Sequence, residues 1–176
     1  EALAVTDIGE VFQRTGLRTF NEFKHFLNVQ EIPRVAFMDS PLQEITIPDN
    51  VKTIGDSAFL RCYYIDNITF GKNLQTINSM AFEDAFNYNT AKSSLCLDFR
   101  NTKLQYINYK AFQQATIGKL YLPASINSFG SDAFYLSKVG NLYIDDLSKW
   151  MKLKPYSNGD VPLTGDTNIW VNGQLL

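Results

Sequence analysis

Apolar and polar residues follow a pattern that recurs along most of this chain. The clearest copy runs from Ile45 to Phe59, and its apolar positions are Ile45, Ile47, Val51, Ile54 and Phe59. Ile45-Thr46-Ile47 alternates with a period of two, which predicts a short strand with two side chains directed inward and one outward. Later copies repeat these offsets, so the chain is expected to fold as a series of equivalent units.

An Ala-Phe pair marks each unit. The pair occurs five times, at steps of 22, 23, 30 and 22 residues between the phenylalanines, which are Phe37, Phe59, Phe82, Phe112 and Phe134. A period of this length is typical of a solenoid, in which each coil packs only on its neighbours. We therefore predict an α/β solenoid, a right-handed coil with short parallel strands stacked into one sheet. Each Ala-Phe segment is expected to form a short helical turn, and the phenylalanines a continuous interior column.

Glycine or asparagine stands four residues before four of these phenylalanines, at Gly55, Asn78, Asn108 and Gly130. Both residue types tolerate positive φ, which predicts a tight corner of the coil. Both are also acceptable helix N-caps, and the sequence leaves the two interpretations open. The first unit has Pro33 at this place, and because proline cannot adopt positive φ, that coil must turn differently.

The two ends of the chain depart from the pattern. Residues 1–40 are predicted to be an N-terminal capping region with a degenerate first repeat, residues 41–144 carry the regular repeats, and residues 145–176 interrupt them. Asn172-Gly173 lies between apolar flanks and predicts a β-hairpin. The sequence then stops on Leu175-Leu176, which another coil would be expected to cover, so we expect a longer parent protein.

Composition and charge exclude several classes of partner. The formal net charge of −2 gives no electrostatic reason to expect nucleic acid or an anionic membrane. No apolar run approaches the roughly 18 residues of a membrane span. The two cysteines, Cys62 and Cys96, lie at different positions of separate coils, so we expect both to be free and Cys62 to be buried.

Residues that catalysis or metal binding would require are sparse. His25 is the one histidine, and because no partner motif accompanies it, we interpret it as structural. One histidine and two dispersed cysteines argue against a zinc site, and no glycine-rich phosphate-binding motif occurs. We predict no catalytic, cofactor or metal site, and a binding surface rather than an enzyme.

Outward strand positions are the candidate ligand contacts. The alternation places Tyr121 and Tyr143 on neighbouring strands, where exposed tyrosines suit a sugar ring or a peptide. Aromatic neighbours in a sheet also serve simply to stabilise it, which is the alternative. Tyr88 lies in an insertion, residues 86–94, that offers a second site. The candidate contacts are Thr46, Thr69, Asp98, Lys119, Tyr121, Tyr143 and Tyr88.

The stretch ITIPDNVKTIGDSAFLRC, residues 45–62, resembles the leucine-rich repeats of the Bacteroides surface protein A (BspA-like) family. The interruption that begins at LYIDDL and ends in the Asn-Gly hairpin is also similar to a recurring break of that family, and the likeness extends over residues 20–176. The resemblance implies an extracellular, non-catalytic adhesion module of a host-associated bacterium that binds host matrix or cell-surface proteins. It implies a secreted or surface location, with an export signal outside this sequence. A structural spacer and a glycan-binding module of a larger surface protein are the alternatives.

Overall fold

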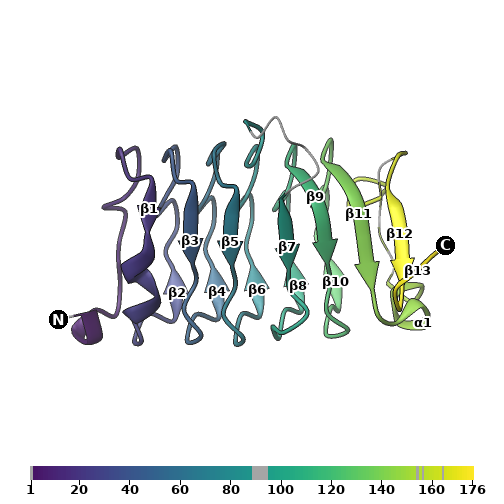
Figure 1. Cartoon of the computed structure of the whole chain (residues 1–176), viewed down its shortest axis with the longest axis horizontal. Coiled ribbons are helices and arrows are strands. Elements are labelled where there is room, and N and C mark those ends of the chain that lie inside the picture. Colours follow the sequence, from purple (N-terminus) through teal and green to yellow (C-terminus); the bar gives the residue numbers. More distant parts are fainter. Residues whose placement is uncertain (1, 89–94, 154, 156, 164) are drawn as a thin grey trace.

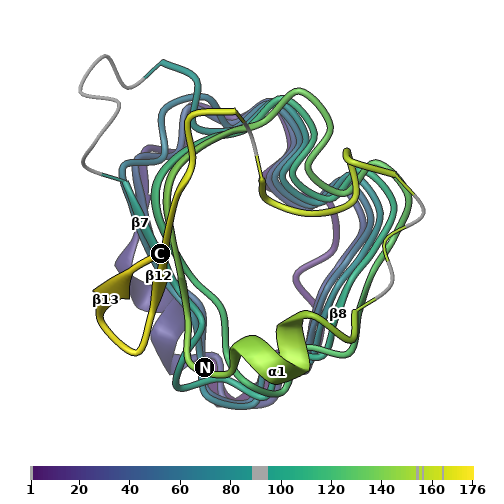
Figure 2. The ribbon, with the colours of Figure 1, turned by 90° about the vertical axis from the view of Figure 1, so that its right-hand side faces the viewer.

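The chain winds into a rod of stacked coils. The computed structural model describes residues 2–88, 95–153, 155, 157–163 and 165–176. Figure 1 shows the coils side by side, with the N-terminus and C-terminus at opposite ends of the rod. Viewed along the rod, each coil overlies the next around a shared interior (Figure 2). Equivalent residues of successive units therefore occupy equivalent places, as the repeat predicts.

One wall of the rod is built from the strands that correspond to Ile45-Thr46-Ile47 in successive coils. Three of these strands form a parallel sheet in the order β1 (Thr19–Phe20), β3 (Glu44–Thr46) and β5 (Asn67–Thr69). The wall continues in a five-stranded sheet of β7 (Cys96–Asp98), β9 (Thr116–Tyr121), β11 (Lys138–Ile144), β12 (Asn168–Val171) and β13 (Gln174–Leu175). All these strands pair in parallel except β13, which forms a hairpin with β12 through Asn172 and Gly173. The two turn residues have φ of 49° and 78°, as an Asn-Gly hairpin turn requires.

A second wall carries its own parallel sheet, so the prediction of one sheet is wrong. This sheet orders β10 (Ser128–Phe129), β8 (Tyr106–Ile107), β6 (Thr76–Ile77), β4 (Thr53–Ile54) and β2 (Glu31–Ile32). Each strand has two residues, too short for the period-two alternation to show in the sequence. The first wall is also divided, because β5 and β7 do not pair. The longest repeat, with its insertion, lies between these two strands.

The Ala-Phe segments are turns rather than helices, which corrects the predicted α/β class. In the second unit, the Ala58 amide donates to the Gly55 carbonyl at 3.2 Å, and Ser57 and Arg61 have φ of 55° and 57°. The Phe59 amide then donates to the Ala81 carbonyl of the next coil at 2.8 Å. Every second amide of this segment thus bonds to the next coil, which a helix would not allow. Helices in the described residues are the α-helix α1 (Leu147–Trp150) and the 3₁₀-helices η1 (Ala2–Ala4) and η2 (Asn21–His25).

The explanation predicted for the corner, positive φ at the glycine or asparagine itself, is also wrong. Positive φ falls two residues after the glycine or asparagine, at Ser57, Met80, Lys110 and Asp132. Glycine is used because the coils approach closely: a Cβ on Gly55 would lie 2.6 Å from the Ile32 carbonyl oxygen. The asparagines instead bond to each other, with Asn108 Nδ2 donating to Asn78 Oδ1 at 3.0 Å. Since no helix follows, the N-cap alternative does not apply.

Phenylalanines form the predicted column through the interior. The rings of Phe37, Phe59, Phe82, Phe112 and Phe134 stack in sequence with centroids 5.0, 5.0, 5.2 and 5.2 Å apart. All five are at most 2% exposed. Phe12 adds a ring at the N-terminal end, 5.4 Å from Phe37. This column and the flanking isoleucines and leucines make one continuous core.

A buried carboxylate continues the hydrogen bonds between the turns of successive coils at the point where the Ala-Phe motif ends. In the preceding coil the Lys110 amide donates to the Ser131 carbonyl, but the Asp132 amide donates to the Asp160 side chain at 2.9 Å. Asp160 is fully buried and also accepts from the amide and hydroxyl of Ser157. The Phe134 amide reaches the Gly159 carbonyl at 2.7 Å. Residues after 145 thus complete a further coil without the Ala-Phe motif.

Candidate functional site

The parallel register brings three of the candidate contacts into one row. Asp98 pairs with Tyr121 and Tyr121 with Tyr143, so their side chains lie side by side on the outside of the first wall. Lys119 lies in the adjacent row, between Cys96 and Asn141. The outward alternation is as predicted, since Ile45, Leu97, Leu120 and Leu142 of these strands are buried.

The remaining candidates lie elsewhere. Thr46 pairs with Thr69 in the three-stranded sheet, across the break between β5 and β7. Tyr88 lies in a turn and belongs to no strand of the first wall. Its side chain is 66% exposed, and its ring centroid is 4.7 Å from that of Tyr64. Of the predicted insertion, residues 86–94, the structure describes 86–88, and residues 89–94 lie outside the described residues. Phe86 is fully buried, so it belongs to the core rather than to an exposed loop.

The aromatic row extends further than the sequence indicates. The rings of Tyr121 and Tyr143 stack with centroids 4.1 Å apart and planes at 11°, and Trp170 stacks on Tyr143 at 5.7 Å. The guanidinium of Arg100 lies over the other face of Tyr121, 4.1 Å from the ring centroid. We call these four residues the aromatic strip; it crosses β9, β11 and β12 and begins just after β7 (Figure 1). All four side chains remain partly exposed.

Two members of the strip were missed from the sequence. Trp170 lies in Ile169-Trp170-Val171, directly before the Asn-Gly turn, and this alternation is the signal that could have placed it outward on a further strand. Its indole Nε1 donates to Asn141 Oδ1 at 3.0 Å. Arg100 follows Asp98 by two residues, the spacing of one face of an extended chain, but nothing in the sequence indicates that it reaches sideways to the Tyr121 ring.

An ion pair fixes the end of the strip. Arg100 Nη2 lies 2.6 Å from Asp98 Oδ2, and Arg100 Nε is 3.0 Å from Asp98 Oδ1. These hydrogen bonds from Arg100 lower the pKa of the Asp98 carboxyl and raise that of the guanidinium. Burial, followed by the neighbouring Tyr143, raises the pKa of the Tyr121 hydroxyl. Asp98 therefore holds the Arg100 guanidinium over the Tyr121 ring.

Replacing Asp98 by asparagine tests this pair through its pH dependence. Because the folded-state pKa lies below the usual 3.8, the pair stabilises the fold above that pH, and its contribution is lost as the pH falls through the folded-state value. We expect Asp98→Asn to lose less stability than the wild type between about pH 5 and pH 2. The difference should not exceed ~1 kcal/mol because both side chains are partly exposed. Urea unfolding at each pH measures it.

Asp66→Asn is the matched control for that experiment. Asp66 is exposed just before β5 and belongs to none of the ion pairs found among the described residues. Its replacement should leave the acid dependence as in the wild type. If the free energy of unfolding of Asp98→Asn fell with decreasing pH as steeply as that of the wild type, the assigned ion pair would be contradicted.

Both cysteines are free, as predicted. Cys62 is fully buried, its thiol donates to the Phe37 carbonyl at 3.0 Å, and burial raises its pKa to about 12. Cys96 points outward from β7, and burial by its neighbours raises its thiol pKa as well. Both thiols are protonated near neutral pH, which makes them poor nucleophiles.

The described part of the chain does not bring together the residues that were considered for catalysis or metal binding. His25 ends η2 with an exposed side chain. Within the described part of the chain, no three histidine, cysteine, aspartate or glutamate side chains gather closely enough to hold a metal ion. In the same residues, no helix is long and apolar enough to cross a membrane.

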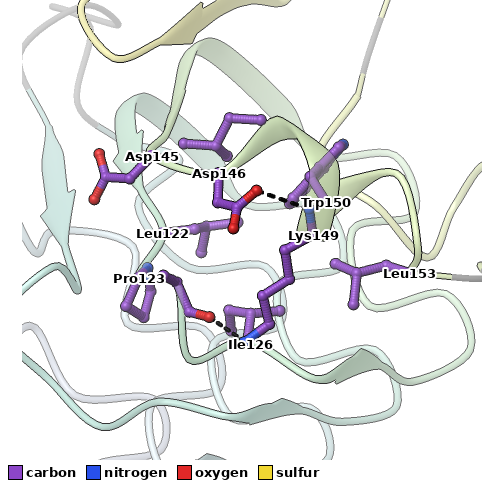
Figure 3. Close-up of a pocket in the computed structure, with 10 residues that line it drawn as sticks. Leu122, Pro123, Ile126, Asp145, Asp146, Lys149, Trp150 and Leu153 are labelled. Carbon is purple, nitrogen blue, oxygen red and sulfur yellow. Dashed lines mark hydrogen bonds between the residues drawn. The ribbon is translucent and has the colours of Figure 1, made fainter.

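A small hollow lies where α1 packs on the coil, lined largely by apolar side chains (Figure 3). Two of its charged residues bond to main-chain groups: Asp146 Oδ1 accepts from the Lys149 amide at 2.9 Å, and the Lys149 amine donates to the Ala124 carbonyl. Trp150 packs edge-on against Phe129 at 5.6 Å. These contacts fasten α1 to the rod, and the hollow is a feature of that packing.

Stacked coils, parallel strand ladders and a phenylalanine column define a solenoid of the leucine-rich-repeat class. The family model of the BspA type leucine rich repeat region matches this chain in six copies, over residues 6–95 and 30–157. The chain belongs to this family.

Two solved structures are similar to the chain. The leucine rich repeat protein of T. pallidum is 24% identical, with a TM-score of 0.53, over 66% of this chain and 52% of that protein. The pneumococcal vaccine antigen PcpA is also 24% identical, with a TM-score of 0.41, over 65% of this chain and 22% of the antigen. The chain thus spans about half the length of the T. pallidum protein, whose likeness supports the fold. No curated protein sequence matches significantly.

Proposed function

We propose that this chain is an extracellular, cell-surface module that binds a host matrix or cell-surface protein through the aromatic strip, and that it is not an enzyme. Support comes first from the family, whose members are implicated in attachment at bacterial surfaces. It comes also from the position of the strip on hydrogen-bonded strands, since a rigid platform loses little entropy on binding. Lys119, Thr46 and Thr69 extend the contact along the same wall, and Tyr88 adds a contact beside it.

The observation that carries the proposal is the composition of the strip. Tyrosine, tryptophan and arginine are the residues that contribute most to protein–protein binding, because they combine large contact area with a polar end. Here four such side chains lie in an unbroken row from Arg100 to Trp170. Cross-strand packing alone would account for two stacked rings, but it does not require an arginine and a tryptophan at the ends.

The way the rings stack favours a protein ligand over a glycan. A sugar binds an aromatic side chain by lying flat on a ring face, yet both faces of Tyr121 and of Tyr143 are covered by their neighbours in the strip. What Tyr121 and Tyr143 offer a ligand is ring edges and two phenol hydroxyls, beside the guanidinium of Arg100. Those groups suit hydrogen bonds and edge contacts to a peptide surface.

The proposal is tested by probing arrays of purified extracellular-matrix proteins and of glycans with the wild type and a Tyr143→Ala/Trp170→Ala variant. We expect the wild type to bind at least one matrix protein and the variant to bind it at least ~10-fold more weakly, as loss of interface hot spots predicts. Tyr106→Ala, on the second wall, is the matched control because Tyr106 is 42% exposed and far from the strip in the coil.

Each other outcome contradicts the proposal in a recognisable way. Binding to glycans alone, lost in the double variant, would make this a glycan-binding module. Silence on both arrays would favour a structural spacer. Matrix binding that falls equally with Tyr106→Ala would place the contact elsewhere on the rod.

A further inference from the structure

We propose that Tyr121 and Tyr143 form a site of oxidative cross-linking, where a haem peroxidase with hydrogen peroxide joins the two rings into a dityrosine bridge between adjacent coils. This inference is independent of the ligand of the strip. It rests on the geometry and exposure of the two phenols.

The two rings are held in the arrangement that coupling requires. Tyr121 and Tyr143 are register partners on the parallel strands β9 and β11, so their backbones are fixed at the spacing of paired strands. Their centroids lie 4.1 Å apart and their planes are within 11° of parallel. The two rings therefore face each other at contact distance. Both side chains are also partly exposed, so the peroxidase can reach them.

The reaction balances with one peroxide for each bridge. The peroxidase reduces hydrogen peroxide to two waters, taking one electron and one proton from each phenol. The two phenoxyl radicals form one carbon–carbon bond between the positions ortho to the hydroxyls. The hydrogens on those two carbons then move to the oxygens as the rings regain aromaticity, and the product has two hydrogen atoms fewer than the protein.

Position favours this pair over other exposed tyrosines. A radical couples fastest with a partner already in contact, because no encounter has to precede the bond. Tyr106, Tyr109 and Tyr135 are 42%, 42% and 46% exposed, yet none of them stacks on another tyrosine in the described part of the chain. Exposure alone would oxidise these residues first, whereas contact selects two pairs, Tyr64 with Tyr88 and Tyr121 with Tyr143. Of these two pairs, Tyr121 and Tyr143 are the ones that stack nearly parallel on paired strands.

A bridge here would join two coils covalently. Coils of a solenoid are held to each other only by nearest-neighbour contacts, so the rod can open between any two of them. A covalent bond from β9 to β11 would prevent these two coils from separating. It would also restrict the conformations of the unfolded chain, as other cross-links do.

The test uses the full chain in a Tyr88→Phe background, which removes the tyrosine pair formed by Tyr64 and Tyr88. The protein is treated with a haem peroxidase and hydrogen peroxide, the monomer is isolated on a denaturing gel, and tryptic peptides are analysed by mass spectrometry. We expect a joined peptide of residues 120–138 and 139–149, lighter by two hydrogen atoms than the sum of its parts. Tyr121→Phe and Tyr143→Phe, which keep the stacked ring, should each abolish it, and Tyr106→Phe should not change its yield.

Three results would overturn the inference. One is oxidation of other tyrosines without the joined peptide, and another is cross-linking found only between molecules. The third is persistence of the joined peptide in Tyr121→Phe, since Tyr135 lies in the same tryptic peptide and would then be the partner.

Discussion

Replacing Phe82 by alanine is expected to lower the free energy of unfolding by about 3–5 kcal/mol, as truncation of a buried phenylalanine does. Phe82 is fully buried at the centre of the column, with Phe59 at 5.0 Å, Phe112 at 5.2 Å and Phe86 at 5.5 Å. The cavity would open between coils whose backbones are tied to each other by hydrogen bonds, so collapse cannot fill it. Urea unfolding followed by circular dichroism measures the change.

Phe12→Ala provides the comparison for that variant. Phe12 stacks on Phe37 at the end of the column and is only half-buried, so its neighbours can relax around the missing ring. We expect a loss well below that of Phe82→Ala. Equal losses at both positions would mean that the column is not a continuous, close-packed element.

The second large effect is expected for Gly71→Ala, at about 3 kcal/mol, in the range of substitutions that overfill a packed site. A Cβ on Gly71 would lie 2.2 Å from the Pro48 carbonyl oxygen and 2.6 Å from the Pro48 carbonyl carbon. Both atoms belong to the main chain of the preceding coil, so one coil has to move away from the other. The loss should appear in urea unfolding.

Gly165→Ala is the matched control, because nothing lies within 4 Å of a Cβ built there and its φ is not positive. This variant should stay within about 0.5 kcal/mol of the wild type. If Gly71→Ala were equally harmless, the close approach of the coils at Pro48 would be refuted.

The period of the sequence predicts the stacking, because equivalent apolar residues of successive units are buried together when the coils stack in register. Ile45, Ile68 and Leu120 are inward strand residues in the sequence and buried strand residues in the rod. The column of phenylalanines follows from the same register. These features depend on side-chain burial, which the pattern of apolar residues records directly.

The conformation of the Ala-Phe segments could not be predicted in this way. Their amides bond to the next coil, so the acceptor of Phe59 is Ala81, in another unit of the repeat. Residues with positive φ there include Ser57, Met80 and Lys110, none of which suggests a left-handed backbone. Contacts between coils impose this conformation, and local residue preference does not record it.

The candidate site could be predicted only in part, because only two of its four residues are placed by the register of the repeat. The adjacency of Tyr121 and Tyr143 follows from register alone. Arg100 reaches the row through its long side chain, and Trp170 through a coil that lacks the repeat motif, so neither could be placed by counting offsets.

Asp160 shows that a coil of this rod does not need its motif. Since one carboxylate and one turn supply the acceptors that Ser131 and Ala133 provide one coil earlier, a stretch of unrelated sequence can be wound in without a break in the fold. The number of motifs in such a protein is therefore a lower bound on its number of coils. A segment that lacks the repeat motif can thus contribute a strand to the same sheet as the repeats, as β12 does beside β11.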